Sequence, residues 1–453
     1  MLDTPQRNRE VDLGKDGRAD EPARAKVLLV SDNRDEVNWG CRATSIALHG
    51  LLSENFDVTA RLGRYDALRK ESRLAPIARL SARGGNPLQR VLVKALIHRS
   101  DYISGDIEKS AEYILANQGS SPFFKTVVAK VEQADHVVIN GEGCLVFKPN
   151  ERRDVRYLLT MLELARRLGK PAYYVNAMIS DFPGAARNQT TWETCRKIFS
   201  RCAGVQVRDH HSFELLQEMR LDTRTAVAPD ALFSAADSAQ FPNLHPAKVP
   251  APMLAPFPED PERLAWSFDK PYICVGGSSY FRSQGRTAEG PAFYIALARL
   301  IRDMGYQCIF VATCTGDQFL EAVARDCGCD FIPVHTGLFV GSAILANASA
   351  FVSGRFHPTI LATAGGTPCV FLESNSHKMG SLRLWLGDEE EEIRYRDPDA
   401  IAAIKRHLTR LLAEGATLRH EIYAKACELS RMSRAIPGMI DGTAAVQSIP
   451  AAT

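Results

Sequence analysis

Short apolar runs alternate with stretches of helical periodicity in the first half of the chain. The runs that predict buried strands lie at residues 26–30, 56–62, 134–140, 172–175, 204–207 and 225–228. Apolar residues with helical spacing lie between them at residues 41–52, 156–168, 191–201 and 212–219. Strands that alternate with helices in this way predict a doubly wound α/β domain with a parallel sheet.

The same alternation resumes after residue 270 and defines a second half. Its expected strands lie at residues 271–276, 307–312, 331–334, 348–352 and 369–372, and its expected helices at 289–304, 317–327, 359–364, 398–414 and 419–432. Seven prolines between residues 234 and 270 mark a linker between the two halves.

We therefore expect two Rossmann-like doubly wound domains that face each other across a cleft, as in the GT-B architecture. The expected segments are a disordered N-terminal tail (1–24), an N-terminal α/β domain (25–234), a proline-rich linker (235–270), a C-terminal α/β domain (271–432) and a C-terminal tail (433–453). Basic residues are dense between residues 61 and 99, where residues 88–98 have helical spacing. These charges favour either an anionic acceptor or a solvated helical face.

Composition narrows the class of protein. The 453 residues carry a formal net charge of +2, with 45% hydrophobic and 24% charged residues, which is typical of a soluble globular protein without a nucleic-acid partner. Several of the 11 cysteines lie in apolar runs, as reduced thiols of a cytoplasmic protein do. Cys327 and Cys329 lack the spacing of a zinc site, so we expect no metal. The charged first 24 residues predict no signal peptide, and no run approaches the ~20 apolar residues of a membrane span.

Candidate chemistry lies where one strand ends. The expected strand at 348–352 stops at Ser353-Gly354 and is followed by Arg355, His357 and Pro358, which suits the first turn of a helix. A strand, a polar turn and a helix N-terminus form a site for an anion, which Arg355 could hold and His357 could protonate. The alternative is that Arg355 pairs with a carboxylate and His357 is a hydrogen-bonded turn residue.

Four short motifs follow one another between roughly residues 27 and 385. They are Asn38-Trp39-Gly40-Cys41-Arg42-Ala43, Val207-Arg208-Asp209-His210-His211-Ser212, Asp230-Ala231-Leu232-Phe233, and Ser353-Gly354-Arg355-Phe356-His357 with Gly366-Thr367-Pro368 and Lys378 behind it. In this order and spacing they resemble the motifs of the polysaccharide pyruvyl transferase family. The chain differs from the family's usual pattern at residues 141–144, where members carry a plainer glycine run, and in the loop after Val175.

The resemblance implies an enzyme that transfers the pyruvyl group of phosphoenolpyruvate to two hydroxyls of a sugar and thereby forms a ketal. Arg208 and Arg355, one in each half, would clamp the donor, because a guanidinium binds carboxylate or phosphate through two bonds. His357 would be the general acid that protonates the enol carbon. Phe356 and Lys378 complete the donor-binding set, and no metal or other cofactor is required.

The N-terminal half would then form the acceptor side and the C-terminal half the donor side. Candidate acceptor-side or loop residues are Asn38, Gly40, Arg42, Gly141, Glu142 and Gly143. Glu142 is a candidate acceptor-side base. Arg208 could instead pair with Asp209 or Asp230, and Lys378 could be solvated rather than bound to donor phosphate.

Two other functions stay open at this point. The chain could be a GT-B glycosyltransferase that uses a nucleotide sugar, for which Glu373 is the nearest candidate ribose ligand. It could also be a non-catalytic glycan-binding protein on the same scaffold. The expected partners are phosphoenolpyruvate and a glycan or lipid-linked saccharide. A lipid-linked acceptor would place this cytoplasmic protein peripherally at the inner face of a membrane. The sequence does not predict an oligomeric state.

Overall fold

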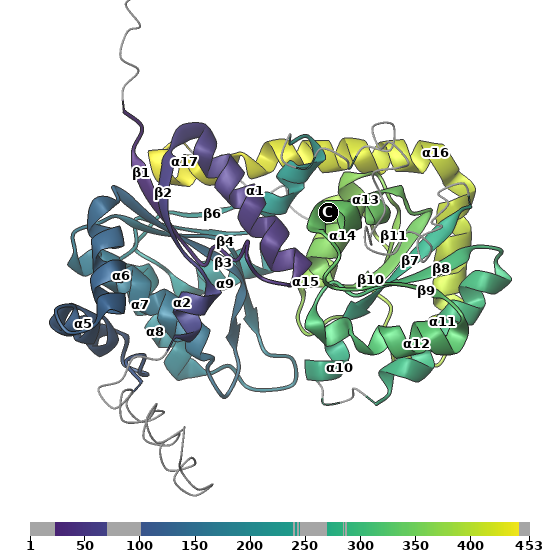
Figure 1. Ribbon diagram of the computed structural model, residues 1–453, viewed down its shortest axis with the longest axis horizontal. Helices are drawn as coiled ribbons and strands as arrows, with labels where there is room; N and C mark the ends of the chain where they lie inside the picture. Colours follow the sequence, from purple (N-terminus) through teal and green to yellow (C-terminus); the bar gives the residue numbers. More distant parts are fainter. Residues whose placement is uncertain are drawn as a thin grey trace, which may run out of the picture.

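The protein consists of two α/β halves that lie side by side (Figure 1). The computed structural model describes residues 23–69, 101–238, 241, 244, 270–283, 285 and 288–443. The expected helix at 88–98, the N-terminal tail up to residue 22 and most of the expected linker at 235–270 lie outside these residues.

The N-terminal domain is built on a six-stranded parallel sheet with the order β2-β1-β3-β4-β5-β6. Its strands are β1 (Lys26–Val30), β2 (Asp57–Leu62), β3 (His136–Phe147), β4 (Ala172–Asp181), β5 (Gly204–Val207) and β6 (Thr225–Val227). Its helices are α1 (Trp39–Asn55), α2 (Arg64–Leu68), α5 (Ile107–Asn117), α6 (Pro122–Gln133), α7 (Arg153–Arg167), α8 (Gln189–Phe199), α9 (His210–Met219) and the 3₁₀ helix η1 (Ala231–Ala236).

The C-terminal domain is built on a five-stranded parallel sheet with the order β11-β10-β7-β8-β9. Its strands are β7 (Tyr272–Ser278), β8 (Gln307–Val311), β9 (Asp330–Ile332), β10 (Ala350–Gly354) and β11 (Cys369–Phe371). Its helical segments are α10 (Tyr280–Ser283), α11 (Gly290–Asp303), η4 (Thr315–Asp317), α12 (Phe319–Cys327), α13 (Leu338–Asn347), α14 (Phe356–Ala364), α15 (Lys378–Leu386), α16 (Ala400–Ser433) and α17 (Ala435–Asp441).

The apolar runs form central strands because helices cover both faces of each sheet. Every residue of β7 and of β10 is buried, and such strands contain continuous apolar runs rather than alternating ones. The expected pair of Rossmann-like domains with a GT-B-like arrangement is therefore confirmed.

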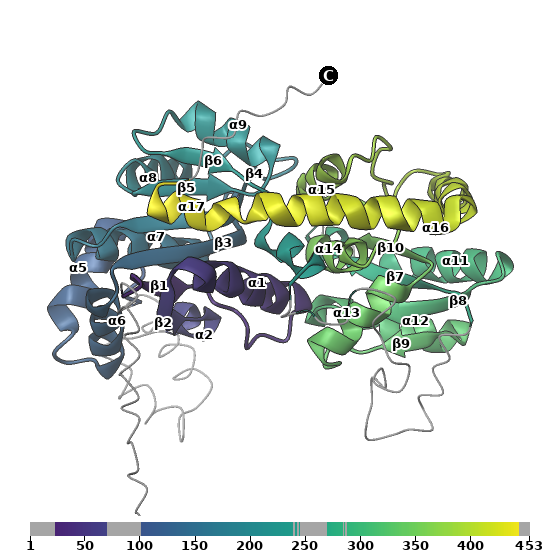
Figure 2. The same ribbon diagram turned by 90° about the horizontal axis from the view of Figure 1, so that it is seen from above.

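The end of the chain differs from the expected tail at 433–453. α16 joins the two helices expected at 398–414 and 419–432 across a kink at Gly415, where φ is 57° and ψ is −129°. It runs along both domains and leads into α17, which packs against β4 and β5 of the N-terminal domain (Figure 2). The expectation of a tail is wrong for residues 435–441, because Ile436, Met439 and Ile440 are buried on that domain.

Trp39, the first residue of α1, joins the two domains. Its side chain is fully buried, and its indole Nε1 donates to the carbonyl oxygen of Val334 at 2.8 Å. Its backbone nitrogen donates to the carbonyl oxygen of Thr313 at 3.0 Å. The ring packs against α13 at Gly341, where a Cβ would lie only 2.0 Å from Trp39 Cη2. The N-terminal domain thus inserts an aromatic side chain into the C-terminal domain.

Replacement of Trp39 by alanine should lower the free energy of unfolding by about 3–5 kcal/mol, because it removes a large buried side chain and leaves a cavity. Gly341→Ala should also be destabilising, because the added Cβ has no room beside the indole. Gly337→Ala is the matched control, since nothing lies within 4 Å of a Cβ there. Guanidinium denaturation measures all three, and a Gly341→Ala variant as stable as Gly337→Ala would contradict the packing described.

Candidate active site

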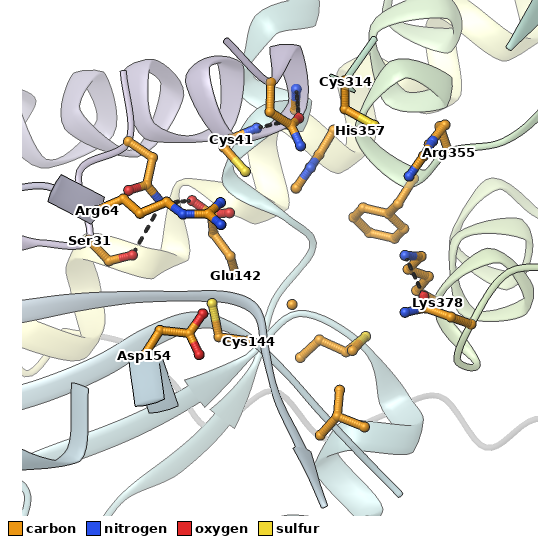
Figure 3. Close-up of a pocket in the computed structure, with 18 of the residues that line it drawn as sticks. Ser31, Cys41, Arg64, Glu142, Cys144, Asp154, Cys314, Arg355, His357 and Lys378 are labelled. Carbon is orange, nitrogen blue, oxygen red and sulfur yellow. Dashed lines mark hydrogen bonds between the residues drawn. The ribbon is translucent and has the colours of Figure 1, made fainter. Parts of the chain in front are cut away.

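A cavity of about 280 Å³ lies between the two domains and receives side chains from both (Figure 3). The expected residues that line it are Asn38, Gly40, Glu142, Gly143, Arg208, Arg355, Phe356, His357 and Lys378. In a parallel sheet the carboxyl ends of all strands meet at one edge, which is where ligands bind in open α/β sheets. Arg208 follows β5 and Arg355 follows β10, so two strand ends from different domains supply the two arginines.

Residues with strained backbone lie toward the carboxyl ends of the strands in the N-terminal sheet. Three residues other than glycine have positive φ there: Ser31 (62°) after β1, Glu142 (42°) in β3 and Asn176 (54°) in β4. Such conformations cost on the order of 1–3 kcal/mol each and cluster at functional sites.

Arg208 lies at the junction of the two domains. Its guanidinium Nη1 donates to Asp230 Oδ2 at 2.7 Å, and the guanidinium lies 4.2 Å from the centre of the Phe356 ring. Both charged side chains are buried, Arg208 to 2% exposure and Asp230 to 0%. The pairing of Arg208 with Asp230, which was one alternative from the sequence, is present, and the same arginine also lines the cavity.

His357 contacts this ion pair from the C-terminal domain. Its Nε2 lies 3.1 Å from Arg208 Nη1 and 3.4 Å from Asp230 Oδ2. The ring can therefore accept a hydrogen bond from the guanidinium when neutral and donate one to the carboxylate when protonated. Burial by itself raises the pKa of Asp230, but the charges of His357 and Arg208 outweigh burial and hold that pKa well below its usual range. Asp230 thus remains an anion beside the imidazole.

Gly40 provides the space that His357 occupies. A Cβ at Gly40 would lie 2.5 Å from His357 Nδ1, so any other residue would displace the imidazole. Asn38 is the N-cap of α1, and its side chain accepts hydrogen bonds from the backbone nitrogens of Gly40 and Cys41. These two residues of the first motif therefore position the histidine of the last motif.

Arg355 is held by a carboxylate that the sequence analysis missed. Its Nη2 donates to Asp317 Oδ1 at 2.5 Å and its Nε to the same oxygen at 3.1 Å. Asp317 is fully buried in η4 and also accepts from the backbone and hydroxyl of Thr313. Its carboxylate fits only because Gly277 has no Cβ, which would lie 1.9 Å from Oδ1. The available signal was an aspartate shortly after the carboxyl end of a strand.

Lys378, the first residue of α15, provides a third cationic group. Its Nζ donates to Asn375 Oδ1 at 2.9 Å and to Ser279 Oγ at 3.1 Å. Burial, followed by the charges of Arg355 and Arg208, lowers the pKa of Lys378 to about 7. The amine is therefore partly neutral near pH 7 and would gain a proton if an anion bound beside it.

The N-terminal side of the cavity is formed by Glu142 and its neighbours. The Glu142 carboxyl is buried, and its Oε1 accepts from Asn33 Nδ2 at 2.8 Å and from Asn140 Nδ2 at 3.4 Å. Burial raises the pKa of this carboxyl, although His357 and the Asn33 hydrogen bond offset part of the effect. Further residues line this side that were not expected from the sequence, namely Ser31, Asn33, Cys41, Arg64, Cys144, Arg152 and Asp154.

Two expected site residues do not line the cavity. Arg42 lies on the first turn of α1, and its Nε is buried without a hydrogen-bond partner among the described residues. Gly141 packs against Ala177 and Tyr174, where a Cβ would lie 2.5 Å from the Ala177 Cβ. Arg42 in α1 and Gly141 in β3 are therefore neighbours of residues that line the cavity and do not line it themselves.

The chain belongs to the polysaccharide pyruvyl transferase family, whose model matches residues 85–376, well over half of the chain. No curated protein matches the chain. Within the described part of the chain, none of the helices combines the length and the apolar character that crossing a membrane requires.

Solved structures with a similar fold come from other enzymes. UDP-GlcNAc 2-epimerase from Neisseria meningitidis, bound to UDP-GlcNAc, is 11% identical with a TM-score of 0.54 over 92% of this chain and 100% of that one. S. aureus MnaA in its UDP co-structure is 11% identical with a TM-score of 0.53 over 92% of this chain and 96% of that one. At these identities the likeness shows the fold alone.

The lowered pKa of Lys378 should make this lysine react with acetic anhydride at neutral pH. The rate of Lys378 acetylation should rise through pH 7 and level off above about pH 8, because only the neutral amine is nucleophilic. An ordinary lysine, with a pKa near 10.4, keeps gaining reactivity up to about pH 10. Peptide mass spectrometry after short pulses at each pH measures the rate, with the exposed Lys125 as internal control. A Lys378 rate that rises in parallel with that of Lys125 would contradict the shift.

Proposed function

We propose that this protein transfers the pyruvyl group of phosphoenolpyruvate to two hydroxyls of a saccharide and forms a cyclic ketal. The observation that supports this most directly is the convergence of Arg208, Arg355, Lys378 and His357, from two domains, on one cavity. Membership of the polysaccharide pyruvyl transferase family supports the same reaction.

The three cations suit the two anionic groups of the donor. Phosphoenolpyruvate carries a carboxylate and a phosphate, and each guanidinium can bind either of them through two hydrogen bonds. Asp230 and Asp317 fix the guanidiniums from behind, so the donor meets groups that are already oriented. Lys378 would become fully charged when the donor binds, because the new anion offsets its arginine neighbours.

His357 is the proposed general acid. In its protonated form it donates a proton to the methylene carbon of the enol, which leaves the adjacent carbon electrophilic. One saccharide hydroxyl adds to that carbon and loses its proton, phosphate leaves, and a second hydroxyl closes the ring. Of the two protons released by the hydroxyls, one replaces the proton taken up by carbon and the other leaves with the phosphate. The reaction therefore balances as donor plus diol giving ketal plus hydrogen phosphate.

The acceptor is proposed to be a glycan or a lipid-linked saccharide. The N-terminal side of the cavity offers polar side chains suited to hydroxyls, including those of Ser31 and Asn33. A lipid-linked acceptor would bring the protein to the inner face of a membrane from the cytoplasm.

A nucleotide-sugar transferase is the second candidate, because the fold is shared with proteins crystallised with UDP-GlcNAc and UDP. That reading needs a carboxylate for the ribose, and Glu373 was the nearest candidate. In the structure Glu373 Oε1 accepts from the backbone nitrogen of Tyr395 at 2.6 Å, and the residue does not line the cavity. This arrangement favours the phosphoenolpyruvate reading.

Phosphoenolpyruvate should raise the melting temperature of the protein, whereas UDP-GlcNAc and UDP-glucose should not. At 100 times its dissociation constant the donor should add about 2.7 kcal/mol of stability. Arg355→Lys should weaken this effect, because lysine keeps the charge beside Asp317 but loses the planar fork. Arg325→Lys, at an exposed position on α12, should respond as the wild type does. Stabilisation by the UDP-sugars alone would instead favour the nucleotide-sugar reading.

His357→Gln should slow phosphate release from phosphoenolpyruvate by about 10²- to 10⁴-fold, since glutamine occupies similar space but cannot donate the proton. The stabilisation by phosphoenolpyruvate should remain, because the arginines are retained. Coupled phosphate detection with saccharide acceptors measures the rate, and differential scanning fluorimetry measures binding. Wild-type turnover in His357→Gln would remove this histidine as the acid.

A further inference from the structure

Glu142 occupies a backbone position that glycine would fill at lower cost. Its φ of 42° lies in the left-handed region, and the residues on both sides of it are glycines. A glutamate in this conformation is held at a cost of about 1–3 kcal/mol, which the surrounding structure must offset. The side chain is the only part of Glu142 that glycine could not supply, so a role is to be sought in its carboxyl group.

The carboxyl of Glu142 differs from the other buried carboxyls around the cavity. Asp230 is bound to Arg208 and Asp317 to Arg355, so both are fixed as anions. Glu142 forms no ion pair with any residue that the structure describes, and its side chain is held by the neutral amides of Asn33 and Asn140.

The amide hydrogen bonds of Glu142 do not use its second carboxyl oxygen, which is therefore able to take up a proton. Both amides donate to Oε1, and the Cys41 thiol also hydrogen-bonds to the carboxyl. Burial raises the pKa of the Cys41 thiol far above its ordinary value, so Cys41 stays protonated. The groups bonded to the carboxyl are therefore neutral, and burial raises the pKa of Glu142, although the charges of His357 and Arg208 across the cavity offset part of this effect. A raised pKa makes Glu142 a stronger base than an exposed carboxylate.

Glu142 faces the donor-side groups across the cavity. Figure 3 shows Glu142 with Cys41 on the side of the N-terminal domain, Arg355 and Lys378 on the opposite side, and His357 between them. A saccharide hydroxyl bound on the N-terminal side of the cavity would therefore lie between Glu142 and a donor held by Arg355 and Lys378.

We infer that Glu142 is the general base that accepts the proton of the attacking saccharide hydroxyl, an inference that rests on the proposed function. In this step the hydroxyl oxygen forms a bond to the central carbon of the donor, its proton passes to the Glu142 carboxylate, and the proton from His357 passes to the methylene carbon. Phosphate then leaves with the electron pair of the carbon–oxygen bond. The second hydroxyl closes the ring and returns its proton to His357, and Glu142 releases its own proton to the departing phosphate or to water. Both groups end in their starting protonation states.

The test is phosphate release from phosphoenolpyruvate by wild-type protein, Glu142→Gln and Glu142→Gly. The acceptors are p-nitrophenyl glycosides of galactose, glucose, mannose and the N-acetylhexosamines. Glu142→Gln keeps an oxygen that can accept from Asn33, and Glu142→Gly relieves the positive φ. Both should lose about 10²-fold or more in turnover while stabilisation by phosphoenolpyruvate stays at the wild-type level. Glu132→Gln, at an exposed position on α6, is the matched control and should be fully active.

The pH dependence of kcat/KM for the acceptor distinguishes a general base from a residue that only stabilises the loop. The acidic limb of kcat/KM for the acceptor should disappear in Glu142→Gln, while the basic limb should stay as in the wild type. Wild-type turnover in Glu142→Gln, or an unchanged acidic limb, would overturn the role of Glu142 and leave the proposed function intact. Absence of phosphate release by the wild-type protein with every acceptor would overturn both.

Discussion

A buried ion pair at the domain boundary, Arg208 with Asp230, connects the parts of the candidate site that come from the two domains. Taking two charges out of water costs several kcal/mol per ion, and the pair is stable only if further hydrogen bonds satisfy the carboxylate. Asp230 collects these bonds, because it also accepts from Thr44 Oγ1 of α1 at 3.0 Å and from the backbone nitrogen of Leu232 at 2.9 Å. His357 Nε2 also lies 3.4 Å from Asp230 Oδ2. This single carboxylate therefore contacts α1, the end of the N-terminal sheet and the C-terminal domain.

The sequence was sufficient to predict the fold, because strands that are buried on both faces appear in the sequence as continuous apolar runs. It was insufficient for the end of the chain. The seven residues of α17 carry buried Ile436 and Met439, whose partners lie on β4 and β5, more than two hundred residues earlier. Gly204 has to lack a side chain for Met439 to pack there, since a Cβ would lie 2.5 Å from its sulfur. A contact between such distant and short segments leaves no periodic signal.

The expected ends of the strands were sufficient to predict the arginines of the candidate site. Arg208 and Arg355 directly follow strands of two different sheets, and in each open α/β sheet ligands bind beyond the carboxyl ends of the strands. Chain order therefore places each arginine at the binding edge of its own sheet, and the contact between the domains brings the two edges together. The supporting carboxylates were harder to find. Asp230 was identified from the sequence only as a possible partner of Arg208, and its contact with His357 depends on how the domains meet. Asp317 lies in a 3₁₀ turn that reaches Arg355 only through the gap left by Gly277, which no local pattern reveals.

The chain passes between the domains twice, once between β6 and β7 and again along α16. Two connections between the domains restrict their relative movement more than a single connection would. A movement that separated α1 from α13 would draw Trp39 out from beside Gly341 and break its hydrogen bond to Val334. Because Asn38 and Gly40 on either side of Trp39 line the cavity, the docking of this one indole ring links the shape of the cavity to the contact between the domains.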